Sequence, residues 1–195
     1  MAADMTPHTS FLERGGLWVV GQSVLMLAVV GLGVRFHGDG TELAVIIPGL
    51  LLFALGGIIG IAGVLALKTN RTPFPKPCEG SQLVQRGIYG RIRHPLYTSV
   101  ILAGLGWAAL WQSWPAGLAA LALAPFFTAK ARREERWLRE QFAAYVDYQS
   151  RVPRFVPRWR RRPEPPPRAG AAGAKAHGDP AARPTSRLSR FWHTL

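Results

Sequence analysis

Three long uncharged stretches of hydrophobic residues, separated by polar connections, dominate the pattern along the chain. Residues 15–34 carry no charged side chain over 20 positions, and residues 43–67 carry none over 25. An apolar stretch of about 18 residues or more is long enough to cross the hydrocarbon core of a bilayer as a helix. Each of these two blocks therefore predicts a transmembrane helix.

The first block also stands where a secretory signal sequence would stand, which is the alternative interpretation. A signal sequence starts with a basic segment and has a hydrophobic part of about 7–15 residues. Here Arg14 is opposed by Asp4 and Glu13, and the hydrophobic part is longer. We therefore prefer a transmembrane helix.

The third block, residues 95–129, is 35 residues long, which is too long for one transmembrane helix and short for two. Its centre, residues 111–117, reads WQSWPAG, a sequence typical of a turn at a membrane interface. We expect a tight helical hairpin with arms of about 16 residues, or about 24 Å each. Such arms are short for a hydrocarbon core of about 30 Å, so they should extend partly into the headgroup layer.

Lysine and arginine residues predict the orientation of these helices. Lysine and arginine are frequent in the connection between the second and third blocks and in the whole chain after residue 129. The connection 35–42 contains a single lysine or arginine, Arg35. Positive charge is enriched on the cytoplasmic side of membrane proteins. The predicted fold is therefore an all-α, multi-pass integral membrane protein with about four transmembrane helices and both termini in the cytoplasm.

The expected organisation has four segments. An N-terminal cytoplasmic segment, 1–14, precedes two transmembrane helices in 15–67; a core in 68–157 contains the hairpin and a cytoplasmic helix; and a basic tail, 158–195, follows. The last 45 residues carry 11 Lys and Arg against two acidic residues, which is +9 of the formal net charge of +13. They show no periodic apolar face after about residue 162, so we expect disorder. Attraction to anionic lipid headgroups is the preferred role, and nucleic-acid binding is the alternative that we do not expect.

Two further patterns are structural rather than chemical. Gly56 and Gly60 form a GxxxG motif, which is typical of close packing between transmembrane helices. Cys78 is the single cysteine, and the histidines are scattered, so the sequence predicts neither an internal disulfide nor a metal site.

The third block begins with the sequence RIRHPLY, in which basic residues precede a helix start. Pro95 suits the first turn of a helix because it has no N–H group to leave unpaired. The other free N–H groups of that turn, together with Arg91 and Arg93, would favour a carboxylate or phosphate. The alternative is that these arginines only anchor the helix at the membrane surface.

Residues 130–148 form an amphipathic pattern that predicts a cytoplasmic helix. Leu138, Phe142 and Tyr145 fall on one side of this helix, and most charged residues fall on the other. The expected apolar face would pack against the rest of the core.

Glu134 does not follow this division, because it projects at the edge of the apolar stripe, whereas Glu135 lies towards the flank. A carboxylate on an apolar face near a membrane is unfavourable unless it has a cationic partner. That partner is either Arg91, Arg93 or another arginine, or it is a cationic ligand. A zwitterionic ligand similar to an amino acid would suit both this carboxylate and the basic helix start.

Several of these elements together resemble a known family. The run LVQRGIYGRIRHPLY (83–97), the hydrophobic hairpin, RREERWLREQF (132–142) and YQSRVPRFVP (148–157) resemble the isoprenylcysteine carboxyl methyltransferase and phospholipid methyltransferase family of integral membrane enzymes. The resemblance covers about residues 74–157 and uses four elements in order. The resemblance implies an S-adenosylmethionine-dependent methyltransferase with a cofactor site on the cytoplasmic side.

The same resemblance implies which residues line the site. It places Lys130 and Arg133 on the substrate side, and it assigns no catalytic residue. The acceptor would be lipidic or prenylated, and methyl transfer would be carboxyl O-methylation or lipid N-methylation. The residues expected to bind the cofactor are Gln82, Leu83, Val84, Tyr89, His94, Pro95, Leu96, Tyr97 and Glu134.

The chain departs from the family pattern at two places. Ser99 stands where a glycine is usual, which could tighten packing at the site. The segment 142–145 is shorter than the usual Phe-Gly-x-x-Tyr, which could displace Tyr145 by a helical step.

Two alternatives belong to other functional classes. Some membrane sterol reductases, which use NAD(P)H, are similar in their His-Pro-x-Tyr region, and a membrane interaction protein without activity is the other alternative. The double glutamate followed by RVPRFVP favours the methyltransferase.

Overall fold

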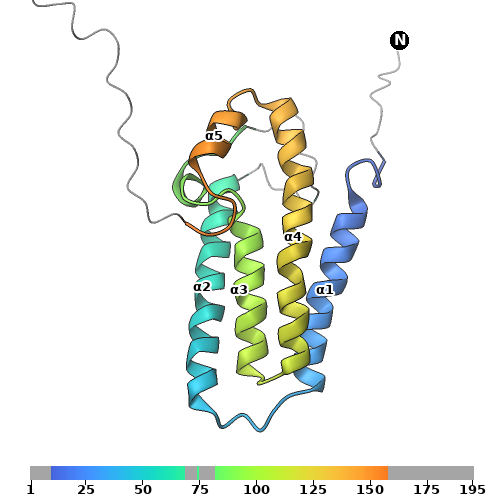
Figure 1. Ribbon diagram of the computed structural model, residues 1–195, viewed down its shortest axis with the longest axis vertical. Helices are drawn as coiled ribbons and strands as arrows, with labels where there is room; N and C mark the ends of the chain where they lie inside the picture. Colours follow the sequence, from blue (N-terminus) through green and yellow to red (C-terminus); the bar gives the residue numbers. More distant parts are fainter. Residues whose placement is uncertain (1–9, 69–73, 75–81, 158–195) are drawn as a thin grey trace, which may run out of the picture. The chain divides into compact units, whose positions relative to one another are not determined.

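The computed structural model describes residues 10–68, 74 and 82–157, and these residues form helices joined by turns (Figure 1). None of them forms a strand, so the predicted all-α class is confirmed for this part of the chain. The predicted disorder after residue 162 and the single cysteine lie outside the described residues. The elements in order are α1 (Gly16–Arg35), α2 (Leu43–Leu67), the 3-10 helix η2 (Gly87–Gly90), α3 (Pro95–Leu110), α4 (Trp114–Gln141) and α5 (Tyr145–Arg151).

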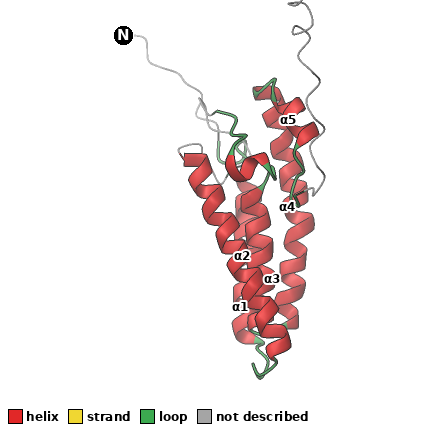
Figure 2. Ribbon diagram, turned by 90° about the vertical axis from the view of Figure 1, so that its left-hand side faces the viewer, coloured by secondary structure: helices red, strands yellow, loops and turns green. Residues whose placement is uncertain are grey.

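The four long helices lie side by side in a bundle, as both views show (Figures 1 and 2). The main packing pairs are α2 with α3, α1 with α4, and α3 with α4. Both α5 and η2 lie at the end of the bundle where α3 begins and α4 ends. This arrangement brings residues before α3 and residues after α4 to the same end.

Apolar side chains cover the outside of the bundle. Large hydrophobic residues such as Leu27, Leu51 and Leu65 are exposed, and α1 and α2 are long and apolar enough to cross a bilayer. α3 is apolar but shorter, at 16 residues. Exposed apolar surface on this scale is typical of contact with lipid or with another protein. Together with the length of α1 and α2, it indicates membrane association.

The turn between α3 and α4 is shorter than the predicted seven residues and consists only of residues 111–113. Gln112 takes the left-handed backbone conformation, with φ at 48°. The Ser113 hydroxyl accepts a hydrogen bond from the N–H group of Ala116 at 3.5 Å and thus caps α4. The remaining residues of the predicted turn, from Trp114 onward, belong to the helix because this cap and Pro115 form a favourable helix start.

The predicted separate amphipathic helix over residues 130–148 is wrong. α4 continues without a break from its uncharged half into the charged half and ends at Gln141. Pro125 removes one N–H donor inside the helix, but no other proline or glycine follows before Gln141, so the helix persists. After a short connection, Tyr145 begins α5, and this tyrosine is buried. The shortened segment 142–145 therefore contains the break between two helices, residues 142–144, and the first residue of α5.

Glycines bring α2 and α3 into close contact, as the GxxxG motif predicted. A Cβ atom on Gly56 would lie 2.8 Å from the carbonyl oxygen of Ser99, and one on Gly60 would lie 3.1 Å from the Ser99 hydroxyl oxygen. On the α3 side, a Cβ atom on Gly106 would lie 2.5 Å from the backbone nitrogen of Phe53. Ser99 therefore lies in the contact between α2 and α3.

Candidate functional site at the start of α3 and the end of α4

His94 connects two neighbouring carboxylates of α4 to the start of α3. Its ring nitrogen Nε2 lies 3.1 Å from Glu135 Oε1, and Nδ1 lies 3.7 Å from Glu134 Oε2. His94 is the residue that directly precedes α3, with Pro95 in the first turn as predicted. The imidazole is buried, so two segments about 40 residues apart meet in a site protected from water.

Glu135 is the centre of a buried ionic network. Its carboxylate accepts hydrogen bonds from Arg93 at 2.9 Å, from Arg154 at 2.6 Å and from the Gln149 amide at 3.2 Å, and the residue is 1% exposed. Burial raises the pKa of Glu135, but hydrogen bonds from His94, Arg154 and Arg93 outweigh burial and hold the pKa well below its ordinary value. Glu135 is therefore an ionised structural carboxylate.

This arrangement reverses the sequence prediction about the two glutamates. We expected Glu134 to need a cationic partner and Glu135 to lie towards the flank, but the two guanidinium groups bind Glu135. The cause is the segment after α5, which folds back so that the carbonyl oxygens of Pro153 and Arg154 accept hydrogen bonds from the backbone before α3. A helical projection of α4 alone cannot show which side this segment covers.

Arg93 is fully committed to the same network and is therefore not a free ligand-binding cation. Its guanidinium group also donates to the carbonyl oxygens of Gln149, at 2.9 Å, and Val152. The backbone N–H group of Arg93 donates to the carbonyl oxygen of Pro153 at 2.9 Å. The predicted role of Arg93 in holding a ligand carboxylate is replaced by this structural role.

Glu134 faces an aromatic environment and remains partly accessible. The hydroxyl group of Tyr97 donates to its carboxylate at 2.6 Å, and the Glu134 side chain is 26% exposed. Tyr97 stacks on His94, with ring centroids 5.2 Å apart, and on Phe127, with centroids 4.7 Å apart. The accessible carboxylate beside stacked rings is suited to a cationic ligand group.

Lys130 adds a buried cation beside this carboxylate. Its ammonium nitrogen donates to the side-chain carbonyl of Gln22 at 2.6 Å and lies 5.3 Å from the centre of the Tyr97 ring, and the residue is 1% exposed. Gln22 belongs to α1, and sequence reasoning did not assign it to the site. The available signal was a polar residue inside the uncharged stretch 15–34.

Tyr89 joins the same cluster from η2. Burial raises the pKa of Tyr89, and the negative charge of Glu134 nearby raises it further. Its carbonyl oxygen accepts a hydrogen bond from the hydroxyl group of Tyr148 at 2.7 Å, which ties η2 to α5. Tyr89 is therefore a buried, neutral phenol whose backbone is held by α5.

Other predicted site residues have packing roles or lie away from the cluster. Leu83 packs against the buried group of Tyr145, Tyr148 and Val152. Pro95 and Leu96 pack against Gly63 of α2. The structure thus brings five predicted residues together: Tyr89, His94, Tyr97, Lys130 and Glu134. Arg133 instead lies over the ring of Trp137. The roles of Gln82 and Val84 stay predictions.

Fold and site together define a helical, membrane-associated protein with a polar cluster at one end of an apolar bundle. The model of the phospholipid methyltransferase family matches residues 44–145, more than half of the chain, and the chain belongs to this family. The match runs from α2 to the start of α5 and contains all five residues of the cluster. α1, with Gln22, and Arg154 lie outside it.

Two curated relatives are named for metal resistance. The nickel-cobalt-cadmium resistance protein NccN of Alcaligenes xylosoxydans xylosoxydans is 28% identical over 78% of this chain and 70% of its own length. The cobalt-zinc-cadmium resistance protein CzcN of Cupriavidus metallidurans is 29% identical over 75% of this chain, which spans 64% of that relative. The family indicates a membrane methyltransferase. The names of the two relatives refer to resistance to metals.

Proposed function

We propose that this protein is an S-adenosylmethionine-dependent methyltransferase that acts on a lipidic or prenylated acceptor in the membrane. The observation that carries the proposal is the convergence of the accessible Glu134 carboxylate with His94 and Tyr97 from a distant segment. The family indicates methyl transfer. The Glu134 carboxylate and the aromatic side chains beside it suit a cofactor with cationic groups. The cofactor supplies an electrophilic methyl group on a sulfonium, and its transfer is an in-line displacement that depends on alignment.

Different residues of the cluster would bind different parts of the cofactor. Glu134 would engage the ammonium group of the cofactor, while Tyr89, Tyr97 and His94 shape the walls. The cofactor carboxylate would lie at the first turn of α3, because the first N–H groups of a helix have no partner within the helix. Gln82 and Val84 remain part of the proposal through the family resemblance. The Glu135 network holds His94 and the backbone before α3 in position.

Lys130 would face the acceptor. A buried ammonium group in a membrane-associated site requires polar partners, and Gln22 supplies one of them. Its charge would favour an acceptor that carries a carboxylate or a phosphate. A carboxylate acceptor would undergo O-methylation, and an amine beside a phosphate would undergo N-methylation.

The proposal includes a four-helix topology with the site and both termini in the cytoplasm. Besides α1 and α2, the apolar helix α3 and the uncharged half of α4 would lie within the membrane, and the exposed Leu118 and Leu121 of α4 would contact lipid. Basic residues then lie on the cytoplasmic side. A periplasm-active reporter fused after residue 195 should remain inactive, and an active fusion would contradict this topology.

Cofactor binding tests the site directly. Isothermal titration of the detergent-solubilised protein with S-adenosylhomocysteine should show binding, and Glu134→Gln should weaken it by about tenfold or more, because one charge-assisted hydrogen bond is lost. His94→Ala should weaken it as well. Glu140→Gln removes an exposed carboxylate from the same helix and is the matched control. Equal affinities in all variants would refute the site, and NADPH competing with S-adenosylhomocysteine would favour the reductase.

Labelling experiments can identify the acceptor, and the names of the two relatives suggest comparing cells with and without metal stress. Purified protein with methyl-labelled S-adenosylmethionine should label a component of a bacterial lipid extract or a prenylated peptide. Extracts from cells grown with and without nickel, cobalt, zinc and cadmium would show whether the acceptor accompanies metal stress. Absence of label in every extract and in the prenylated peptide would contradict the proposed acceptor class.

A further inference from the structure

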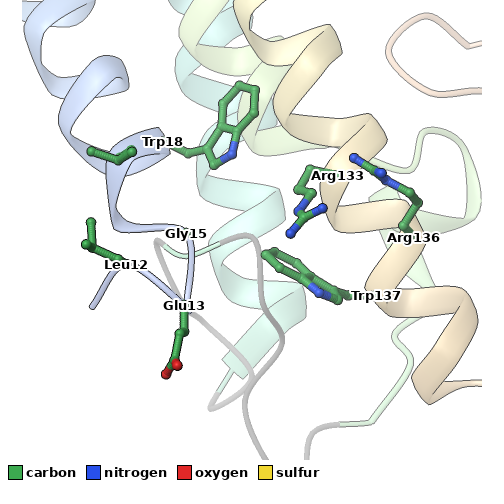
Figure 3. Close-up of a pocket in the computed structure, with 8 residues that line it drawn as sticks. Leu12, Glu13, Gly15, Trp18, Arg133, Arg136 and Trp137 are labelled. Atoms are coloured by element: carbon green, nitrogen blue, oxygen red, sulfur yellow. The ribbon is translucent and has the colours of Figure 1, made fainter. Parts of the chain in front are cut away.

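A second polar feature lies on another face of the bundle, between the start of α1 and the charged half of α4. It is a pocket of about 300 Å³ (Figure 3). Arg133, Arg136 and Trp137 line it from α4, Trp18 lines it from the first turn of α1, and Leu12 lines it from the turn before α1. The proposed cofactor site does not include any of these five residues.

The pocket lies at the depth of the lipid headgroups if α1 crosses the membrane. The 20 residues of α1 span about 30 Å, which matches a hydrocarbon core, so its first turn reaches the headgroup layer. Trp18 packs against Phe126 in the uncharged half of α4, whereas Arg133 and Arg136 follow about two and three turns later. Tryptophan side chains are enriched at this depth of a membrane, and two of them line the pocket.

The charge of the pocket favours an anion. Within the described residues, neither Arg133 nor Arg136 forms an ion pair with a carboxylate. Arg133 instead lies over the ring of Trp137, 4.7 Å from its centre. Glu13 also lines the pocket, but its carboxylate accepts a hydrogen bond from the Ser10 N–H group at 2.7 Å and points away from both arginines (Figure 3). Among the residues that the structure describes, these two cationic groups therefore line the cavity without a carboxylate in an ion pair with either of them.

Exposed apolar side chains continue from the pocket along α1. Leu12 is exposed beside the arginines, and Leu17, which also lines the pocket, is exposed on the first turn of α1. A ligand that fits both parts has a phosphate at one end and hydrocarbon at the other. Guanidinium groups bind phosphate oxygens through paired hydrogen bonds, and exposed leucines suit acyl chains.

We propose that this pocket is a binding site for the headgroup of an anionic phospholipid, with its phosphate held by Arg133 and Arg136 and its acyl chains along α1. The site does not depend on the proposed methyltransferase activity. It also assigns Arg133 to lipid binding, where the family resemblance had suggested the substrate side.

Native mass spectrometry of the full-length protein in a neutral detergent tests the proposal. The protein is titrated with phosphatidylglycerol, and the bound lipid is counted for wild type and for the double variant Arg133→Gln, Arg136→Gln. The double variant should bind the tightest lipid about thirtyfold more weakly, as expected for two arginine contacts at a membrane surface. The matched control is Arg132→Gln with Arg139→Gln, which removes two exposed charges from the same helix outside the pocket.

The control variant should bind phosphatidylglycerol as wild type does, and wild type should bind zwitterionic phosphatidylcholine much more weakly. If both double variants lost the same amount of phosphatidylglycerol affinity, the lipid would be attracted by the net positive charge of the helix, and the proposed site would be overturned. Equal binding of the two lipids would overturn it as well. Soluble glycerol 3-phosphate binding as tightly as the lipid would contradict a role for the acyl chains. Circular dichroism confirms that each variant retains its helices before binding is compared.

Discussion

Replacing Glu135 by glutamine should destabilise the end of the bundle that carries the site. The carboxylate is buried and lies 2.9 Å from Arg93 and 2.6 Å from Arg154. Removing one partner from a buried ion pair costs about 3–5 kcal/mol, because the remaining charge is left uncompensated. Arg154 is 27% exposed and can regain water, and Arg93 keeps two carbonyl acceptors. We therefore expect a loss of about 3 kcal/mol, at the lower end of this range.

Two measurements check this prediction. Unfolding in mixed micelles with increasing sodium dodecyl sulfate, followed by circular dichroism, reports the free energy of unfolding for wild type and variant. Hydrogen exchange reports the local effect: the N–H groups of Arg93 and His94, which donate to Pro153 and Arg154, should lose protection. Glu140→Gln, an exposed change on the same helix, should stay within about 0.5 kcal/mol of wild type. Unaltered unfolding together with unaltered exchange in the Glu135 variant would refute the network as a source of stability.

Three further experiments test the ionisation of Glu135, the glycine packing between α2 and α3, and the contact of Gln22 with Lys130. Because its pKa is lowered, Glu135 contributes stability that is present above its ordinary pKa of 4.5 and is lost as the pH falls below that value; wild type should lose more stability than Glu135→Gln in an acid titration. Gly106→Ala should destabilise the bundle by about 1–3 kcal/mol in the same micelle assay, whereas Gly57→Ala, whose Cβ meets nothing within 4 Å, should not. Gln22→Leu removes a hydrogen-bond partner of the buried Lys130 and should lower stability by about 1–3 kcal/mol; an unchanged melting curve would contradict that contact.

Much of the fold follows from the sequence because local patterns decide it. Uncharged length predicted α1 and α2, and the proline after His94 predicted the start of α3. GxxxG spacing predicted close packing at Gly56 and Gly60, because only a missing side chain permits that approach. The family resemblance also led to Glu134 and His94, which lie 3.7 Å apart in the structure.

The errors have a common physical origin. The predicted boundary between the hairpin and a separate helix was wrong, because charge begins at Lys130 while the helix continues to Gln141. A change from apolar to charged residues marks a change of surroundings, and it does not interrupt backbone hydrogen bonds. Helix ends depend on capping and on residues such as glycine or proline, which this stretch lacks.

By itself, the sequence determined the helical class, the apolar blocks and the residue types available for chemistry at the end of α4. Only the tertiary structure decided which of two adjacent glutamates is buried by arginines and which faces the aromatic cluster. Adjacent helix positions differ by about 100° around the axis, so both were plausible for either role. The choice was made by Arg154 and the backbone of residues 153–154, which return to α4 and to the start of α3. The contact between Gln22 of α1 and Lys130 of α4 was likewise decided only by the tertiary structure. Contacts over such sequence distances leave no periodic signal along the chain.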